Sequence, residues 1–310
     1  MSIPLPPTFR RTRVRVGEVG INTVTAGHGS PVLLLHGYPQ THLIWHHVAA
    51  ALAEQYTVVL TDLRGYGDSD KPPGGPDHRA YAKRTMARDQ VLVMRELGFG
   101  EFAVAGHDRG GRVGHRLALD YPDAVTGLAV LDIVPTRHVF GHADAAFGLG
   151  YWHWFFLAAG DGIPERLIGS NPEFWIRTTM NARQRAGLPF DPAAVAEYVR
   201  CFASPEAIHA SCEDYRAAAS IDLADDEESA SRGDRVTAPV LTLWGSDSFV
   251  GRHYDVLAVW RRYATKVTGQ ALPCDHYLPE QAPAETSSAL LSFLAGLDNS
   301  RRSLQFPYGA

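Results

Sequence analysis

Residues Gly106–Arg112 read Gly-His-Asp-Arg-Gly-Gly-Arg, and this stretch decides the fold that the sequence predicts. It follows an apolar run, Phe102–Ala105, typical of a buried strand, and it leads into a segment with helical character from about 110 to 120. A glycine two residues before and two residues after a central residue is the pattern of a sharp strand-to-helix turn that exposes a nucleophile. The central residue is Asp108, where a serine is more usual. A carboxylate displaces a leaving group from a saturated carbon and forms an ester that water must then hydrolyse, whereas a serine attacks acyl carbons.

Two arginines in the same stretch predict that the site holds an anion. Arg109 and Arg112 are three residues apart, so they lie on one side of the first turn of the expected helix. Cations are disfavoured at a helix N-terminus, because the macrodipole is already positive there. Two guanidinium groups at this position therefore predict a small substrate that carries a carboxylate.

Expected strands alternate with expected helices along most of the chain. Continuous apolar runs, typical of strands buried on both faces of a parallel sheet, occur at 31–35, 56–60, 102–105, 128–134, 239–244 and 267–272. Residues 13–19 and 21–26 alternate as the strands of an edge hairpin do, and 85–97 is an expected helix. This order predicts a doubly wound α/β sheet. Together with the turn at Asp108 it predicts an α/β-hydrolase fold, with a mostly parallel sheet flanked by helices.

The segment 137–235 interrupts this alternation, because it contains no run typical of a buried strand. Its aromatic residues cluster at Tyr151, Trp152, Trp154, Phe155, Phe156, Phe174 and Trp175. We expect a helical cap at 137–235, inserted into a core made of 1–136 and 236–310. Such a cap would cover the nucleophile and exclude water, although most of these aromatic side chains are expected only to pack the cap's own interior.

Composition limits the classes of partner and compartment. The formal net charge of -5 and the pI near 6.3 give no basic surface for nucleic acid. The three cysteines lack a zinc-type spacing, which favours reduced thiols in a cytoplasmic protein. The first residues have no apolar segment of a signal peptide, and no stretch reaches the length of a membrane span, so we expect no membrane partner.

A second motif, His36-Gly37-Tyr38-Pro39, comes directly after the expected strand at 31–35. In this fold that position supplies one donor of an oxyanion hole, although the motif alone would be interpreted as a turn. The backbone N–H groups of Tyr38 and Arg109 would hold the negative oxygen that develops on the carbonyl of Asp108.

Hydrolysis of an ester on Asp108 needs a general base. The chain has 14 histidines, and we select His276 because it follows the last expected strand and because the fold orders its triad as nucleophile, acid and histidine. Two carboxylates could orient this histidine. Asp132 ends one expected strand and Asp247 follows the next, and both lie where sites form in open α/β sheets.

The sequence resembles the fluoroacetate dehalogenases, which are haloacetate dehalogenases with an aspartate nucleophile. The resemblance covers nearly the whole chain and includes stretches inside the expected cap, which makes it more specific than the turn at Asp108 alone. The matching stretches are H-G-Y-P-Q-T-H from His36, H-D-R-G-G-R-V-G-H-R-L-A-L-D from His107, V-L-D-I-V-P-T from Val130, Y-W-H-W-F-F-L from Tyr151, C-E-D-Y-R-A from Cys212 and D-H-Y-L-P-E from Asp275.

This resemblance implies a role for each candidate site residue. Asp108 would be the nucleophile, His276 the base and Asp132 its partner, and Arg109 and Arg112 would bind the substrate carboxylate. It also implies a homodimer.

The resemblance further implies a halide pocket made by His153, Trp154 and Tyr215. Each of these side chains offers an N–H or O–H donor, which suits a leaving group that gains negative charge. The chain departs from the family at Tyr38, where the family carries phenylalanine, and at Asp247, where the family lacks an acid.

The sequence thus predicts hydrolytic dehalogenation of short 2-haloacids, such as fluoroacetate or chloroacetate, to 2-hydroxy acids and halide through an aspartyl ester. No metal or organic cofactor is expected, because the nucleophile is a side chain. An epoxide hydrolase would use the same aspartate turn, but a neutral epoxide offers the paired arginines no anion. A noncatalytic small-acid receptor of the same fold is a third alternative, which the intact nucleophile, base and acid disfavour.

Overall fold

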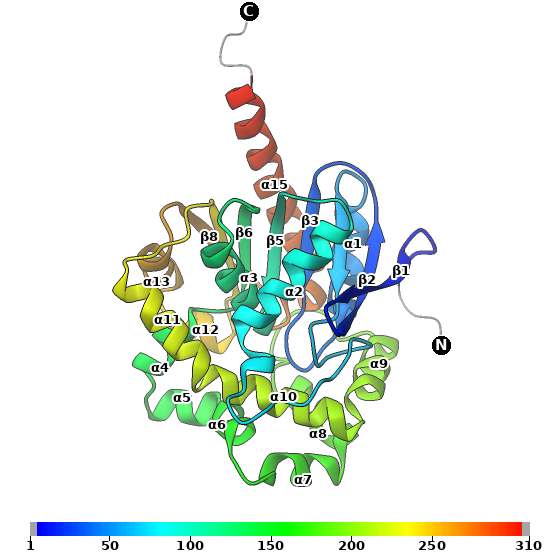
Figure 1. The fold of residues 1–310 in the computed structure, drawn as a ribbon, viewed down its shortest axis with the longest axis vertical. Helices are drawn as coiled ribbons and strands as arrows, with labels where there is room; N and C mark the ends of the chain where they lie inside the picture. Colours follow the sequence, from blue (N-terminus) through cyan, green and yellow to red (C-terminus); the bar gives the residue numbers. More distant parts are fainter. Residues whose placement is uncertain (1–4, 306–310) are drawn as a thin grey trace, which may run out of the picture.

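The structure is a computed structural model that describes residues 5–305, with side chains described as far as residue 300. A sheet in the order β1-β2-β4-β3-β5-β6-β7-β8 forms its centre (Figure 1). The strands are β1 (Arg10–Val16), β2 (Val19–Ala26), β3 (Pro31–Leu35), β4 (Thr57–Thr61), β5 (Phe102–His107), β6 (Val125–Leu131), β7 (Val240–Gly245) and β8 (Val267–Leu272). Strand β2 pairs antiparallel with β1 and β4, and all other neighbours are parallel. The predicted mostly parallel sheet is confirmed.

The hairpin and β6 differ most from the predicted ranges, because of backbone conformation. The hairpin turns at Gly17, which has a φ of 64° as tight hairpin turns require, and not at Gly20 as the alternation suggested. Strand β6 starts and ends three residues earlier than 128–134. Asp132 takes a φ of 54° immediately after β6, so the chain leaves the sheet there.

Helices cover both faces of the sheet. In chain order the elements outside the β6–β7 interval are η1 (His42–Trp45), α1 (His46–Leu52), η2 (Arg79–Tyr81), α2 (Lys83–Glu96), α3 (Arg109–Asp120), α12 (Phe249–His253), α13 (Val256–Tyr263), α14 (Leu278–Gln281) and α15 (Pro283–Gln305). One apolar core holds residues of α2, α3 and α13, and a second holds residues of α1, α14 and α15. The two cores therefore lie on opposite faces of the sheet.

The chain between β6 and β7 is helical throughout its described elements. These are α4 (Thr136–Gly141), α5 (Ala145–Gly150), α6 (His153–Ala158), α7 (Ile163–Gly169), α8 (Pro172–Asn181), α9 (Pro192–Phe202), α10 (Pro205–Ala218) and α11 (Ile221–Ser231). Most of them form the lower layer of Figure 1, and they share the α2–α3 core through residues such as Phe147 and Leu157.

Side-chain caps explain why this segment divides into short helices. Asp144, Asn171, Asp191 and Ser204 accept hydrogen bonds from the first backbone N–H groups of α5, α8, α9 and α10. The last three of these helices also begin with proline, which suits the first turn because its missing N–H would be unbonded there. Loss of one such cap costs about 1 kcal/mol.

No helix in the part of the chain that the structure describes is both long and apolar enough to cross a membrane.

Candidate active site

The turn at Asp108 joins β5 to α3 through a backbone that only its flanking glycines allow. Asp108 has a φ of 46°, which is unfavourable for a residue with a side chain. A Cβ atom on Gly106 would lie 2.5 Å from the carbonyl oxygen of Gly110, and one on Gly110 would lie 2.4 Å from the carbonyl oxygen of His36. Both glycines are therefore needed for β3, β5 and α3 to approach this closely.

The Asp108 carboxylate is buried and faces the predicted oxyanion motif. Its Oδ2 accepts a hydrogen bond from the backbone N–H of Tyr38 at 3.1 Å, while Arg109 follows as the first residue of α3. Burial alone would raise the pKa of Asp108, but interactions with His276, His107 and the arginines outweigh burial and hold this pKa below its ordinary value. At pH 7 both imidazoles are neutral, so the charges of Arg109 and Arg112 are the ones that favour the carboxylate. The carboxylate is therefore ionised at neutral pH, as a nucleophile must be.

His276 and Asp132 form a direct pair beside Asp108. Nδ1 of His276 lies 2.6 Å from Oδ2 of Asp132, whose Oδ1 accepts from Ser248 Oγ at 2.6 Å and from the Gly245 N–H at 3.1 Å. Nε2 of His276 is buried and has no hydrogen-bond partner among the described residues. Burial, aided by Arg183, lowers the pKa of His276 to about 3, so the imidazole is neutral at pH 7. A neutral imidazole with a free Nε2 can accept a proton from water.

The alternative acid, Asp247, lies apart from this pair. Its side chain is exposed in the turn after β7, and its backbone N–H donates to the carbonyl of Cys274 at 3.1 Å. The geometry therefore favours Asp132 as the carboxylate that orients His276.

The two predicted arginines differ in their surroundings. Arg109 forms an ion pair with Asp214, from Nη2 to Oδ1 at 2.6 Å and from Nε to Oδ2 at 3.0 Å, which leaves Nη1 without a partner among the described residues. Arg112 donates from Nη1 to the Val134 carbonyl at 2.9 Å and to Thr136 Oγ1 at 3.1 Å. No carboxylate in the described part of the chain pairs with Arg112, so its buried charge is the less compensated of the two.

The three predicted halide ligands gather above these arginines. The rings of His153 and Trp154 lie 5.9 Å and 5.8 Å from that of Tyr215, and the Arg112 guanidinium lies 4.5 Å from the Trp154 ring. The Trp154 Nε1 is buried with no hydrogen-bond partner among the described residues. Such an unbonded N–H is a donor available to a small anion.

Two residues near the site were missed by sequence reasoning. Arg183 Nη2 lies 2.9 Å from His153 Nε2, and the guanidinium carbon lies 5.2 Å from the centre of the Tyr151 ring, with no ion pair among the described residues. It belongs to an irregular stretch between α8 and α9, which carries no sequence signal. Asp214, the partner of Arg109, precedes Tyr215 in the quoted stretch C-E-D-Y-R-A, so its position offered a signal.

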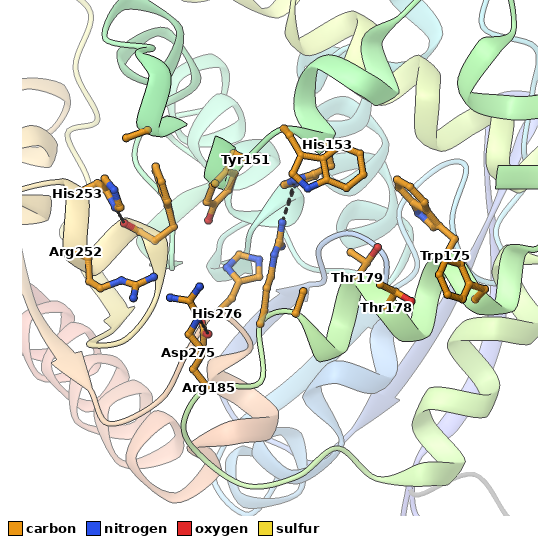
Figure 2. Close-up of a pocket in the computed structure, with 17 residues that line it drawn as sticks. Tyr151, His153, Trp175, Thr178, Thr179, Arg185, Arg252, His253, Asp275 and His276 are labelled. Atoms are coloured by element: carbon orange, nitrogen blue, oxygen red, sulfur yellow. Dashed lines mark hydrogen bonds and ion pairs between the residues drawn. The ribbon is translucent and has the colours of Figure 1, made fainter. Parts of the chain in front are cut away.

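A cavity of about 530 Å³ opens beside the pair of His276 and Asp132 (Figure 2). His276, His153 and Arg183 line it, and Figure 2 shows Tyr151 and His153 on one side and Asp275 with Arg185 on the other. Asp108 does not line it, so the cavity lies outside the buried nucleophile. No group of three or more metal-ligating side chains occurs in the described residues.

A sequence model of the α/β hydrolase fold matches residues 30–283. This chain belongs to the α/β-hydrolase family. This α/β hydrolase is 43% identical over 288 residues to a fluoroacetate dehalogenase from Burkholderia sp., a match that covers 93% of this chain and 94% of the relative. The resemblance to fluoroacetate dehalogenases is confirmed.

Epoxide hydrolases are also similar to this α/β hydrolase. A soluble epoxide hydrolase from Corynebacterium sp. (strain C12) is 36% identical over 280 residues, covering 88% of this chain and 93% of the relative.

Among solved structures, one from Nostoc sp. PCC 7120, described as an α/β hydrolase, is 54% identical with a TM-score of 0.90, covering 92% of this chain and 98% of that one.

Proposed function

We propose that this α/β hydrolase cleaves the carbon–halogen bond of short 2-haloacids, such as fluoroacetate and chloroacetate, through an ester on Asp108. The observation that carries the proposal is the surroundings of Arg112, a buried guanidinium near Asp108 that forms no ion pair with a carboxylate among the described residues. Burial and the charge of Arg109 lower the pKa of Arg112, and the nearby charge of Asp108 offsets them only in part, so this cation lacks a close counter-ion. A carboxylate next to the reacting carbon supplies that counter-ion.

The first step forms the ester. An oxygen of Asp108 attacks the carbon that bears the halogen, and the halogen leaves with the bonding electrons as halide. The unbonded Nε1 of Trp154, with the polar groups of His153 and Tyr215, would stabilise the charge that develops on the halide. Attack from the side opposite the halogen inverts any stereocentre at that carbon.

The second step hydrolyses the ester. His276 Nε2 takes a proton from water, and the resulting hydroxide attacks the side-chain carboxyl carbon of Asp108. The ester C–O bond then breaks, the leaving alkoxide takes the proton from His276 to give the 2-hydroxy acid, and the Asp108 carboxyl group loses its proton to solvent. The backbone N–H groups of Tyr38 and Arg109 would stabilise the oxyanion. Asp132 holds the Nδ1 proton and so leaves Nε2 free to act as the base. Overall, the haloacid and water react to give the hydroxy acid, halide and a proton.

We also propose that residues 137–235 act as a cap over the core of 1–136 and 236–310. The near-complete burial of Asp108 and His276 supports this role, because ester chemistry needs bulk water excluded from the nucleophile. A homodimer and a cytoplasmic location belong to the same proposal and rest on family resemblance and on the three free cysteines.

Epoxide hydrolysis is the second candidate function, and a pair of phenols favours it. The rings of Tyr38 and Tyr215 lie 5.5 Å apart, and phenols can protonate the oxygen of an opening epoxide. Assays with fluoroacetate, chloroacetate and a terminal epoxide would separate the candidates, with halide or diol formation as the measurement. Binding of the acids without turnover would instead indicate a receptor.

Replacing Arg112 with lysine is expected to lower kcat/KM for chloroacetate at least about 10²-fold in a protein that still folds. Lysine keeps the charge but cannot reproduce the planar, paired hydrogen bonds of a guanidinium. Arg116→Lys is the matched control, because Arg116 is also buried on α3 but donates to Ser229 Oγ at 2.8 Å, away from Asp108. Thermal unfolding by circular dichroism checks the fold. Efficient turnover of a neutral haloalkane by the wild type would contradict carboxylate binding by Arg112.

Replacing Trp154 with phenylalanine is expected to reduce turnover of fluoroacetate roughly 10²–10³-fold and turnover of chloroacetate much less. Fluoride departs with the most localised charge and gains most from a fixed donor in a dry site. Trp45→Phe is a matched control, because it removes another buried, unbonded indole N–H from the opposite core. Equal losses on both substrates would show that Trp154 shapes the pocket without binding halide.

A further inference from the structure

The cavity of about 530 Å³ beside His276, here named the outer chamber, is much larger than a haloacetate needs. Its volume is in the range of pockets that enclose drug-sized ligands. A two-carbon acid bound at Arg112 would leave it unused, because neither Asp108 nor Arg112 lines it. The outer chamber nevertheless lies next to the reaction centre, since His276 lines it and also pairs with Asp132.

The charged groups of the outer chamber are mainly cationic. Three arginines line it, namely Arg183, Arg185 and Arg252, and Asp275 is the one carboxylate among its described lining residues. Asp275 lies 4.0 Å from Arg185, which leaves Arg183 and Arg252 without an ion pair in the described structure. Figure 2 shows Arg252, Arg185 and Asp275 on the same side of the chamber as His276. Guanidinium groups that line one cavity repel each other unless an anion lies among them.

Much of the rest of the wall is aromatic, and Thr178 and Thr179 are among its polar residues. Tyr151, Phe174, Trp175 and Phe249 line the outer chamber, and the Phe249 ring stacks on His253 at 3.7 Å. A ligand that fits has an apolar middle part and a second anionic group. Such a molecule can also carry a 2-halocarboxylate at the end that reaches His276.

We propose that the outer chamber binds the distal carboxylate of a longer substrate, and that the enzyme prefers 2-halo-α,ω-dicarboxylic acids to haloacetates. The proposal rests on the proposed function and names the substrate class of that same site. Arg252 and Arg185 bind the distal carboxylate, the aromatic wall packs against the methylene chain, and Arg112 holds the carboxylate next to the reacting carbon. Arg183 forms the inner boundary through its contact with His153.

The test compares 2-chloro-α,ω-dicarboxylates of increasing chain length with 2-chloroalkanoates of the same carbon number. Chloride release gives kcat/KM for each. At the length that reaches Arg252, the dicarboxylate is expected to exceed its monocarboxylate partner about tenfold, as a charge-assisted hydrogen bond to a distal group allows. An absence of any preferred length, or equal values for the two series, would overturn the proposal.

Substitutions of Arg252 and Arg185 test whether these two residues cause the preference for dicarboxylates. Arg252→Gln and Arg185→Gln are expected to remove the dicarboxylate advantage while changing the monocarboxylate values less than twofold, and Arg252→Lys is expected to retain part of it. Arg166→Gln is the control, because Arg166 is an exposed arginine on α7 that does not line the outer chamber. If the glutamine variants lose kcat/KM equally with dicarboxylates and monocarboxylates, and if added salt removes this difference from the wild type, these arginines only attract anions from solution. That result would overturn the proposal.

A failure of the proposed function is distinguishable from a failure of this inference. If the wild type releases halide from no haloacid, the proposed function fails, and calorimetry with unhalogenated α,ω-dicarboxylates still measures the outer chamber. Tighter binding of a dicarboxylate than of the matched monocarboxylate, lost in Arg252→Gln, would support the subsite. Equal binding of the two would overturn it.

Discussion

The His276→Asn variant is expected to release one halide ion per active site and then to stop. Attack by Asp108 on the haloacid needs no base, whereas hydrolysis of the resulting ester needs a group that takes a proton from water. The structure offers His276 Nε2 for that step, since it is buried and unbonded beside the ionised Asp108. Rapid-quench measurement of halide with chloroacetate would show a burst equal to the enzyme concentration, followed by a rate at least about 10²-fold below that of the wild type.

The control for this burst is Asp108→Asn, which lacks the nucleophile and is expected to release no halide at all. A burst from Asp108→Asn would mean that another group attacks the substrate. Continued release by His276→Asn at the wild-type rate would mean that His276 is not the base.

Replacing Asp132 with asparagine is expected to lower kcat about 10⁴-fold, because an amide cannot hold the proton on Nδ1 and the imidazole then presents the wrong tautomer. Asp247→Asn is the matched control and is expected to change kcat less than twofold, since Asp247 is exposed while Asp132 contacts His276 at 2.6 Å. Steady-state rates with chloroacetate measure both. A large loss at Asp247 with little loss at Asp132 would reverse the assignment.

The fold was predictable because its signals are local. The apolar run at β3 and the glycines around Asp108 are short patterns whose meaning does not depend on distant residues. The hairpin was placed wrongly at Gly20 because alternation does not report which glycine takes a positive φ.

The meeting of Asp108, His276 and Asp132 was predictable from the order of the fold, because each follows a parallel strand or its loop at the same edge of the sheet. The ion pair of Arg109 with Asp214 was not, since the two residues are 105 positions apart and meet only because the fold brings α10 to the start of α3. Arg183 was missed for the same reason, because its approach to His153 depends on the path of an irregular stretch.

The most direct test of the account is the mass of the peptide that contains Asp108 after His276→Asn has reacted with chloroacetate. We expect a carboxymethyl ester on that peptide, formed in an amount equal to the halide released, and no such ester in Asp108→Asn. An unmodified Asp108 peptide in a His276→Asn enzyme that continues to release halide would contradict it.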